Sequence, residues 1–222
     1  MRISCKILSV VRKTVVIVLL VSTASLALTT AIQGQTRSQA KYPVKPTKQS
    51  EALTAFLTAP IDFITFKGKK GPSNSGSFKA SPWIYRPKEP GFFYQYKLFG
   101  TPTRYSEGER FRGFSVVVYK FGKEIGDYYD SNETLVAIWC RLRDSDLGQA
   151  DLVGRFVPEI KARFGEPFAV VGGILIYHRH GRALSVHTKD GTVDWFKYVR
   201  LSRDIDAPGA VPELLLQPGP GW

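Results

Sequence analysis

The three histidines of the chain lie within one short stretch, residues 174–200, which reads ILIYHRHGRALSVHTKDGTVDWFKYVR. They are His178, His180 and His187, and Asp194 follows them. Imidazole and carboxylate side chains bind zinc and also act as general bases, so two kinds of chemistry are possible here, a metal site and a hydrolytic site. The register of the strands that carry these side chains determines how far apart they lie, and therefore which of the two sites is feasible.

The distance expected between His178 and His187 is too large for one metal ion. A two-residue turn at His180-Gly181 sets His178 opposite Ala183 and Ile174 opposite His187. His178 and His187 then share a face of the sheet, but at roughly 3.3 Å per residue they lie about 13 Å apart along it. Zinc ligands sit about 2 Å from the ion, so we predict no metal site, and we expect no cofactor.

A hydrolytic site depends on the next turn, Asp190-Gly191. A two-residue turn places His187 opposite Asp194, with Ser185 on the same face, and these are the residue types of a hydrolytic triad. A three-residue turn places His187 opposite Val193 instead, because a one-residue slip moves the partner side chains to the other face. Ser185, His187 and Asp194 are therefore the candidate catalytic residues, and both registers stay open.

Apolar runs predict the strands of a largely antiparallel sheet. They are expected at 61–66, 92–100, 114–122 and 134–143, and then at the runs FAVVGGILIYHR, ALSVHT and TVDWFKYVRL, which predict a three-stranded meander. The run 114–122 is uniformly apolar, which is typical of a central strand. The stretch 67–77 is rich in Gly, Ser and Lys, and it predicts a loop.

The clearest helical signal is GRFVPEIKARFGEP. Pro158 suits the first turn, Ile160 and Phe164 share a face, and Gly165 suits a left-handed stop. A shorter helix is expected in SEALTAFLT, at 50–58. Together the elements predict an α+β fold, in which an antiparallel sheet of two meanders carries one or two short helices on one face.

The helix, the corner FGEP and the strands IYHRHGRALSVHTKDGTVDWF, within 154–199, resemble the helix-plus-strands unit of small envelope proteins of the SmpA/BamE type, which have a BLIP-like fold. The chain departs from that pattern in one respect, because no lipid-attachment cysteine follows its apolar N-terminal segment. The residues upstream of the unit have no counterpart in it. The resemblance implies a binding or scaffolding role in the envelope and not catalysis.

The N-terminal residues predict export. Four basic residues precede an uncharged stretch, 14–32, whose densest apolar part is VVIVLLV, and small residues follow at positions suited to cleavage. Residues 1–31 are either a signal peptide that is removed or an uncut anchor in the inner membrane, and both place the rest outside the cytoplasm, in the periplasm or secreted. The remainder predicts a flexible polar tether at 32–48, one α+β domain at 49–206 and a Pro/Gly-rich tail at 207–222.

The net charge of +12 is unevenly distributed. Eight basic residues and no acidic residue precede Glu51, whereas the rest of the chain has 23 basic residues against 19 acidic ones. A nucleic-acid-binding protein concentrates positive charge on its folded domain, so we expect no nucleic-acid partner and membrane contact only through the N-terminal segment. The one cysteine beyond that segment, Cys140, lies in an apolar strand and is expected to be buried.

The aromatic residues have two interpretations. One is a core of large side chains. The other is an open groove for a partner, with these candidate ligand-binding residues: Tyr94, Tyr96, Lys97, Trp195 and Tyr198. The sequence is therefore most consistent with an exported bacterial envelope protein that is a non-catalytic binding or scaffolding module for an envelope protein, a peptide or a glycan. The alternatives are a small exported hydrolase and a binder of anionic polymers.

Overall fold

The computed structural model of the chain describes residues 46–70, 72–87, 89–98, 113–122, 133–143, 145, 147–219 and 221–222. These residues belong to one unit, Pro46–Trp222. The predicted export segment and nearly all of the predicted tether lie outside the described residues.

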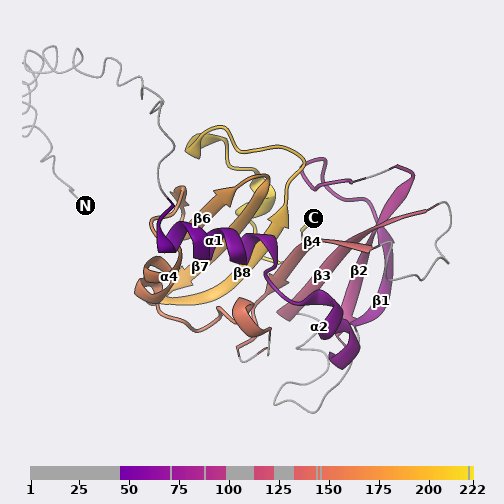
Figure 1. The fold of residues 1–222 in the computed structure, drawn as a ribbon, viewed down its shortest axis with the longest axis horizontal. Coiled ribbons are helices and arrows are strands. Elements are labelled where there is room, and N and C mark those ends of the chain that lie inside the picture. Colours follow the sequence, from indigo (N-terminus) through magenta and orange to yellow (C-terminus); the bar gives the residue numbers. More distant parts are fainter. Residues whose placement is uncertain are drawn as a thin grey trace, which may run out of the picture. The chain divides into compact units, whose positions relative to one another are not determined.

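The strands form one antiparallel sheet in which the two halves of the chain lie edge to edge (Figure 1). The strand order is β1-β2-β3-β4-β8-β7-β6-β5. The strands are β1 (Pro72–Phe78), β2 (Gly91–Leu98), β3 (Phe114–Phe121), β4 (Glu133–Cys140), β5 (Ala169–Val171), β6 (Ile174–Arg179), β7 (Arg182–Lys189) and β8 (Thr192–Arg200). The halves join where β4 pairs with β8. The predicted α+β class with an antiparallel sheet is confirmed.

Tight turns of two residues connect the last four strands. Both residues have positive φ in Gly172-Gly173, in His180-Gly181 and in Asp190-Gly191, as turns that match the twist of a hairpin require. The prediction of one strand over FAVVGGILIYHR is wrong, because Gly172-Gly173 folds this run into the hairpin β5–β6. The second half of the sheet therefore has four strands and not three.

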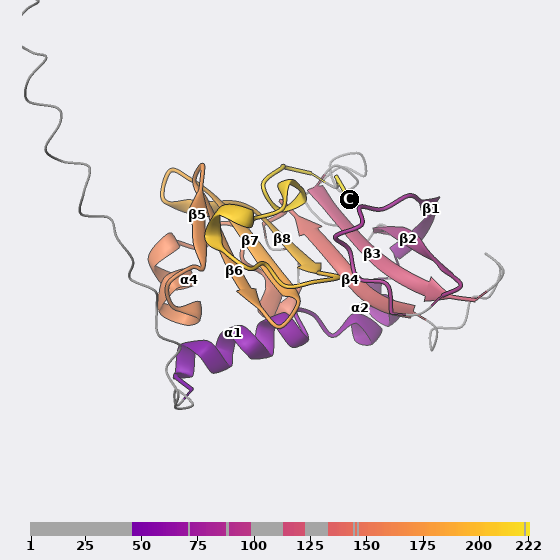
Figure 2. The ribbon, with the colours of Figure 1, turned by 90° about the horizontal axis from the view of Figure 1, so that it is seen from above.

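The two faces of the sheet are covered differently (Figure 2). One face packs against α1 (Lys48–Thr58), α2 (Phe63–Lys70) and α4 (Val157–Phe164), which contribute Phe56, Leu57, Phe66, Ile160 and Phe164 to the core on that side. The other face packs against the C-terminal segment, 205–222, which contains the short 3-10 helices η3 (Pro208–Ala210) and η4 (Glu213–Leu215).

Helix α4 has the predicted boundaries. Pro158 lies in its first turn, and Gly165 ends it with a φ of 81°. Helix α1 begins slightly earlier than predicted, because Thr47 and Ser50 form a capping box. The stretch 147–154 upstream of α4 contains only the 3-10 turn η2 (Gly148–Ala150).

Two predictions for the region 61–77 are wrong. The expected strand 61–66 is the start of α2, because Asp62 accepts a hydrogen bond from the N–H of Thr65 at 3.1 Å and so caps a helix. The expected loop 67–77 contains the end of α2 and the strand β1. β1 is an edge strand, and its backbone pairing with β2 outweighs the low strand propensity of Gly and Ser.

The prediction of a tail outside the domain at 207–222 is also wrong. Leu214 and Leu215 are buried, at 8% and 0% exposure, and they pack with Ile205 against the sheet. Proline and glycine set the local backbone of this segment, but its leucines anchor it by removing apolar surface from water.

Candidate functional site

The last hairpin combines a two-residue turn with a β-bulge. The turn is Asp190-Gly191, as one of the two predicted registers requires. The register then shifts, so that His187 pairs with Trp195 and with neither Asp194 nor Val193. Asp194 is the extra residue of the bulge, and a bulge re-aims the side chain that it carries.

The bulge brings Asp194 against His187 although the two are not paired across the strands. Oδ2 of Asp194 lies 3.2 Å from Nδ1 of His187, but Nδ1 has no hydrogen-bond partner among the described residues, so the contact is close without being aligned. The imidazole stacks on the ring of Trp195, with the ring centroids 5.2 Å apart. Oδ1 of Asp194 lies 3.5 Å from Nε of Arg141.

Ser185 does not join this pair. Its side chain is fully buried, and it pairs with Ile176 on one side and with Lys197 on the other. Within the described part of the chain its Oγ makes no hydrogen bond, to His187 or to any other residue. A nucleophilic serine needs both a base within reach and access to substrate. The structure thus brings together two of the three candidate catalytic residues and leaves the third apart.

His187, Asp194 and Trp195 line a cavity of about 400 Å³. The ends of β4, β6, β7 and β8 form one side of it, and the C-terminal segment forms the other. The remaining lining residues are Trp139, Arg141, Gly172, Ile174, Leu216 and Pro218. A second cavity of about 330 Å³ shares Arg141 and Asp194 with the first and is lined by further charged residues: Arg143, Lys189 and Asp190. We call the first cavity the tryptophan cavity.

Lys197 is the functional candidate that sequence reasoning missed. It lies beside this cavity with a fully buried side chain, and its Nζ donates hydrogen bonds to the backbone oxygens of Leu214 at 2.8 Å and Gln217 at 3.1 Å. The Trp222 ring lies 5.0 Å from Nζ. Burial lowers the pKa of Lys197 to about 8. The available signal was the alternation along TVDWFKYVR, which places position 197 on the same face as Trp195.

Most of the candidate ligand-binding residues belong to the core. Tyr94, Tyr96 and Tyr198 are between 2% and 7% exposed and face the helices, and only Trp195 lines the cavity. The side chain of Lys97 lies outside the description. The core interpretation of the aromatics therefore holds for these three tyrosines.

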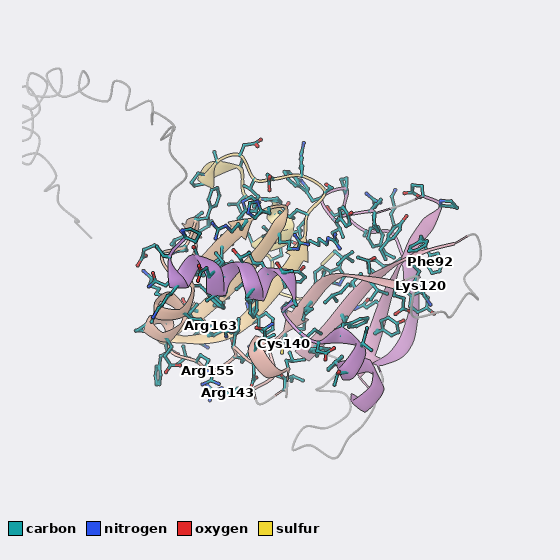
Figure 3. The ribbon with its side chains drawn as sticks, viewed as in Figure 1. Phe92, Lys120, Cys140, Arg143, Arg155 and Arg163 are labelled. Carbon is teal, nitrogen blue, oxygen red and sulfur yellow. The ribbon has the colours of Figure 1, made fainter. Side chains whose placement is uncertain are left out.

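Two of these tyrosines surround a buried ion pair at the far end of β3. Nζ of Lys120, a residue labelled in Figure 3, lies 3.0 Å from Oε1 of Glu133, and both side chains are 3% exposed. The hydroxyl of Tyr96 donates to the same oxygen, and Nζ lies 5.6 Å from the centroid of the Tyr94 ring. These two tyrosines therefore pack inside the core, against the helices and the ion pair, and do not line a surface groove.

The other histidines are placed as their spacing predicted. His178 pairs with Ala183, Ile174 pairs with His187, and His180 is exposed in its turn. Burial lowers the pKa of His178, while the carboxylate of Asp204, 3.0 Å from Nε2, opposes this shift. Within the described residues no group of three or more His, Cys, Asp or Glu side chains is arranged to hold a metal ion.

Cys140, at the end of β4, is buried as expected (Figure 3). Burial raises the pKa of its thiol to about 12, so the sulfur stays protonated at neutral pH. Since the thiolate is the nucleophilic form, this side chain acts as a small apolar group.

No helix among the described residues is long and apolar enough to span a bilayer. No protein-family model matches the chain, and no curated protein or solved structure is significantly similar to it.

Proposed function

We propose that the chain is an exported protein of the bacterial envelope that acts as a non-catalytic binding module, with the tryptophan cavity as its binding site. The observation that carries this proposal is the composition of the cavity. Two indole rings and apolar side chains lie beside one ion pair, Arg141–Asp194, within about 400 Å³. Ligand sites typically combine an apolar lining with a few polar groups that fix orientation, at volumes of about 300–1,000 Å³.

Export rests on the N-terminal residues. The basic start and the uncharged stretch 14–32 have the features of a secretory signal, and a polar stretch follows them in the sequence before the folded unit. The resemblance of 154–199 to SmpA/BamE-type proteins supports a binding or scaffolding role in the same compartment. We propose an envelope protein, a peptide or a glycan as the bound partner.

Site-specific photo-crosslinking in intact cells tests this proposal. A crosslinking amino acid at Pro218, which is exposed and lines the cavity, is compared with one at Gly209, which is exposed on the same C-terminal segment but outside the cavity. We expect a discrete adduct in the envelope fraction from Pro218 only, and we expect His187→Ala to abolish it. Equal labelling from both positions, or a protein confined to the cytoplasm, contradicts the proposal.

The hydrolase alternative has one observation in its favour, the 3.2 Å contact between His187 and Asp194 in an accessible cavity. The complete burial of Ser185 argues against a hydrolase, because a substrate cannot reach its hydroxyl. Hydrolysis of p-nitrophenyl acetate by the full chain decides between the two proposals. Turnover that is lost in both Ser185→Ala and His187→Ala supports a hydrolase, and turnover that neither substitution changes excludes these residues from catalysis.

A further inference from the structure

A row of polar side chains crosses the sheet beneath the C-terminal segment. Lys197 on β8 pairs with Trp139 on β4 and with Ser185 on β7. Directly paired residues of antiparallel strands have their Cβ atoms about 4.5–5.5 Å apart on the same face. The three side chains are therefore immediate neighbours, and all three are at least 95% buried.

The row, together with Trp222, whose ring lies near Nζ of Lys197, holds more buried hydrogen-bond donors than acceptors. Among the described residues, Nε1 of Trp139, Oγ of Ser185 and Nε1 of Trp222 have no hydrogen-bond partner. Indole and ammonium groups can only donate, and a hydroxyl can donate as well. Since a buried donor without a partner destabilises the folded state, the row is incomplete without further oxygen acceptors.

The charge of the row is also uncompensated. Lys197 forms no ion pair with a described carboxylate, and burial is the single cause of its lowered pKa. Its two acceptors, the backbone oxygens of Leu214 and Gln217, are neutral. A buried ammonium is best matched by an anionic oxygen, because charge-assisted hydrogen bonds are about twice as strong as neutral ones.

The segment that supplies these two oxygens is also a wall of the tryptophan cavity. Leu216 and Pro218 line the cavity. In the same short segment, the backbone oxygens of Leu214 and Gln217 contact Lys197. In Figure 2 this segment lies on the opposite side of the sheet from α1 and α2. A molecule entering the cavity therefore meets the residues that cover Lys197.

We propose that the row Trp139–Lys197–Ser185 is the floor of a binding site for an apolar carboxylate, and that the backbone oxygens of Leu214 and Gln217 occupy the position of its carboxylate group in this structure. The inference rests on the proposed binding function and names its ligand class. The buried side chains of Leu214 and Leu215 indicate that the rest of the ligand is aliphatic. A fatty acid and the free C-terminus of a leucine-rich peptide share this chemistry.

Matched probes test the inference on the full chain. Octanoate and N-acetyl-Leu-Leu carry the carboxylate, and octanamide and N-acetyl-Leu-Leu-amide are their neutral counterparts. Binding is followed at pH 7 by the indole N–H signals in ¹H–¹⁵N spectra. We expect at least one carboxylate to bind tenfold tighter than its amide and to shift the Trp139 and Trp222 signals. The better of the two carboxylates distinguishes a lipid-like ligand from a peptide.

Variants and hydrogen exchange complete the test. Lys197→Gln should remove the preference for the carboxylate, while Lys189→Gln, at an exposed lysine of the adjoining cavity, should retain it. A readout that needs no variant is amide exchange at Leu216 and Gln217, whose N–H groups bond to Glu213 in the structure, and carboxylates should accelerate it. Equal affinities for carboxylate and amide, or unchanged exchange, overturn the inference. An adduct from Pro218 in cells would still support the binding function in that case.

Discussion

At the scale of single residues, Lys197 is a fully buried lysine without a described carboxylate partner. Its ammonium is held by two backbone oxygens of the C-terminal segment and lies near the Trp222 ring. Burial without a counter-charge makes the protonated form unfavourable in the folded state, which is why its pKa falls to about 8. The stability of the fold must therefore depend on the protonation of this residue.

The first prediction concerns pH. The folded state releases the Lys197 proton at about pH 8, whereas the unfolded chain keeps it up to about pH 10.5. Between these values the unfolded state binds more protons, so the free energy of unfolding should rise with pH. The gain, about 3 kcal/mol at most, should appear relative to Lys197→Met, which does not titrate. Urea unfolding of both proteins from pH 7 to pH 10 measures it, and parallel pH profiles would contradict it.

Two buried serines give a matched pair for a second prediction. The Oγ of Ser185 has no partner among the described residues, whereas the Oγ of Ser115 accepts a hydrogen bond from Nε2 of Gln95 at 2.7 Å. Ser185→Ala should raise the free energy of unfolding by about 1 kcal/mol, and Ser115→Ala should lower it by about the same amount. Chemical denaturation of the two variants tests this, and a loss of stability in both would show that Ser185 is satisfied.

At the scale of elements, the hairpins of the second half position the candidate site. Their two-residue turns define the registers of β5 to β8, and the bulge at Asp194 then displaces the pairing of β7 and β8 by one residue. This shift stacks His187 on Trp195 and turns Asp194 toward both His187 and Arg141. A regular ladder would have paired His187 with Asp194 directly and left Trp195 without this stacking partner.

A third prediction tests the backbone conformation of the turn Asp190-Gly191. Gly191 has a φ of 77° and open space around it, so replacement by alanine tests conformation and not packing. Gly191→Ala should lower the free energy of unfolding by about 1 kcal/mol, because a side chain disfavours left-handed backbone. Gly209 also has open space but an ordinary φ, so Gly209→Ala is the control and should cost nothing. Equal effects in thermal denaturation would argue against a strained turn.

At the scale of the whole unit, the sheet has two cores. Helices cover one face, and the C-terminal segment covers the face that carries Trp139, Trp195 and Lys197. The second core is completed by the last residues of the chain, so the site and the stability of the fold depend on the same segment. Such coupling between a covering segment and a site allows a bound ligand to alter stability.

A fourth prediction follows for truncation. Deleting residues 207–222 removes Leu214 and Leu215 from the core and leaves the face around Lys197 uncovered. The free energy of unfolding should fall by more than about 3 kcal/mol, from the apolar burial of two leucines alone. Urea unfolding together with binding of an apolar dye measures the loss. Deleting only residues 219–222 should cost less, and equal stability of both truncated chains and the full chain would contradict the role of the leucines.

Short-range patterns in the sequence predicted a good part of the second half. The limits of α4, the turn His180-Gly181 and the separation of His178 from His187 follow from residues close in the chain, and the structure agrees with each. These features are local because turn chemistry and helix caps act over a few residues. Composition predicted a loop at 67–77, but pairing with β2 makes part of this stretch the strand β1.

What only the tertiary structure decided is the environment of the candidate site. The bulge at Asp194 moves the strand register by one residue, which no alternation pattern reveals. Lys197 is buried because a segment 17 to 20 residues later folds over it, and no local pattern around position 197 predicts that contact. By itself the sequence determined which residues alternate along β7 and β8. Contacts between distant segments determined which of those residues meet and which are hidden from water.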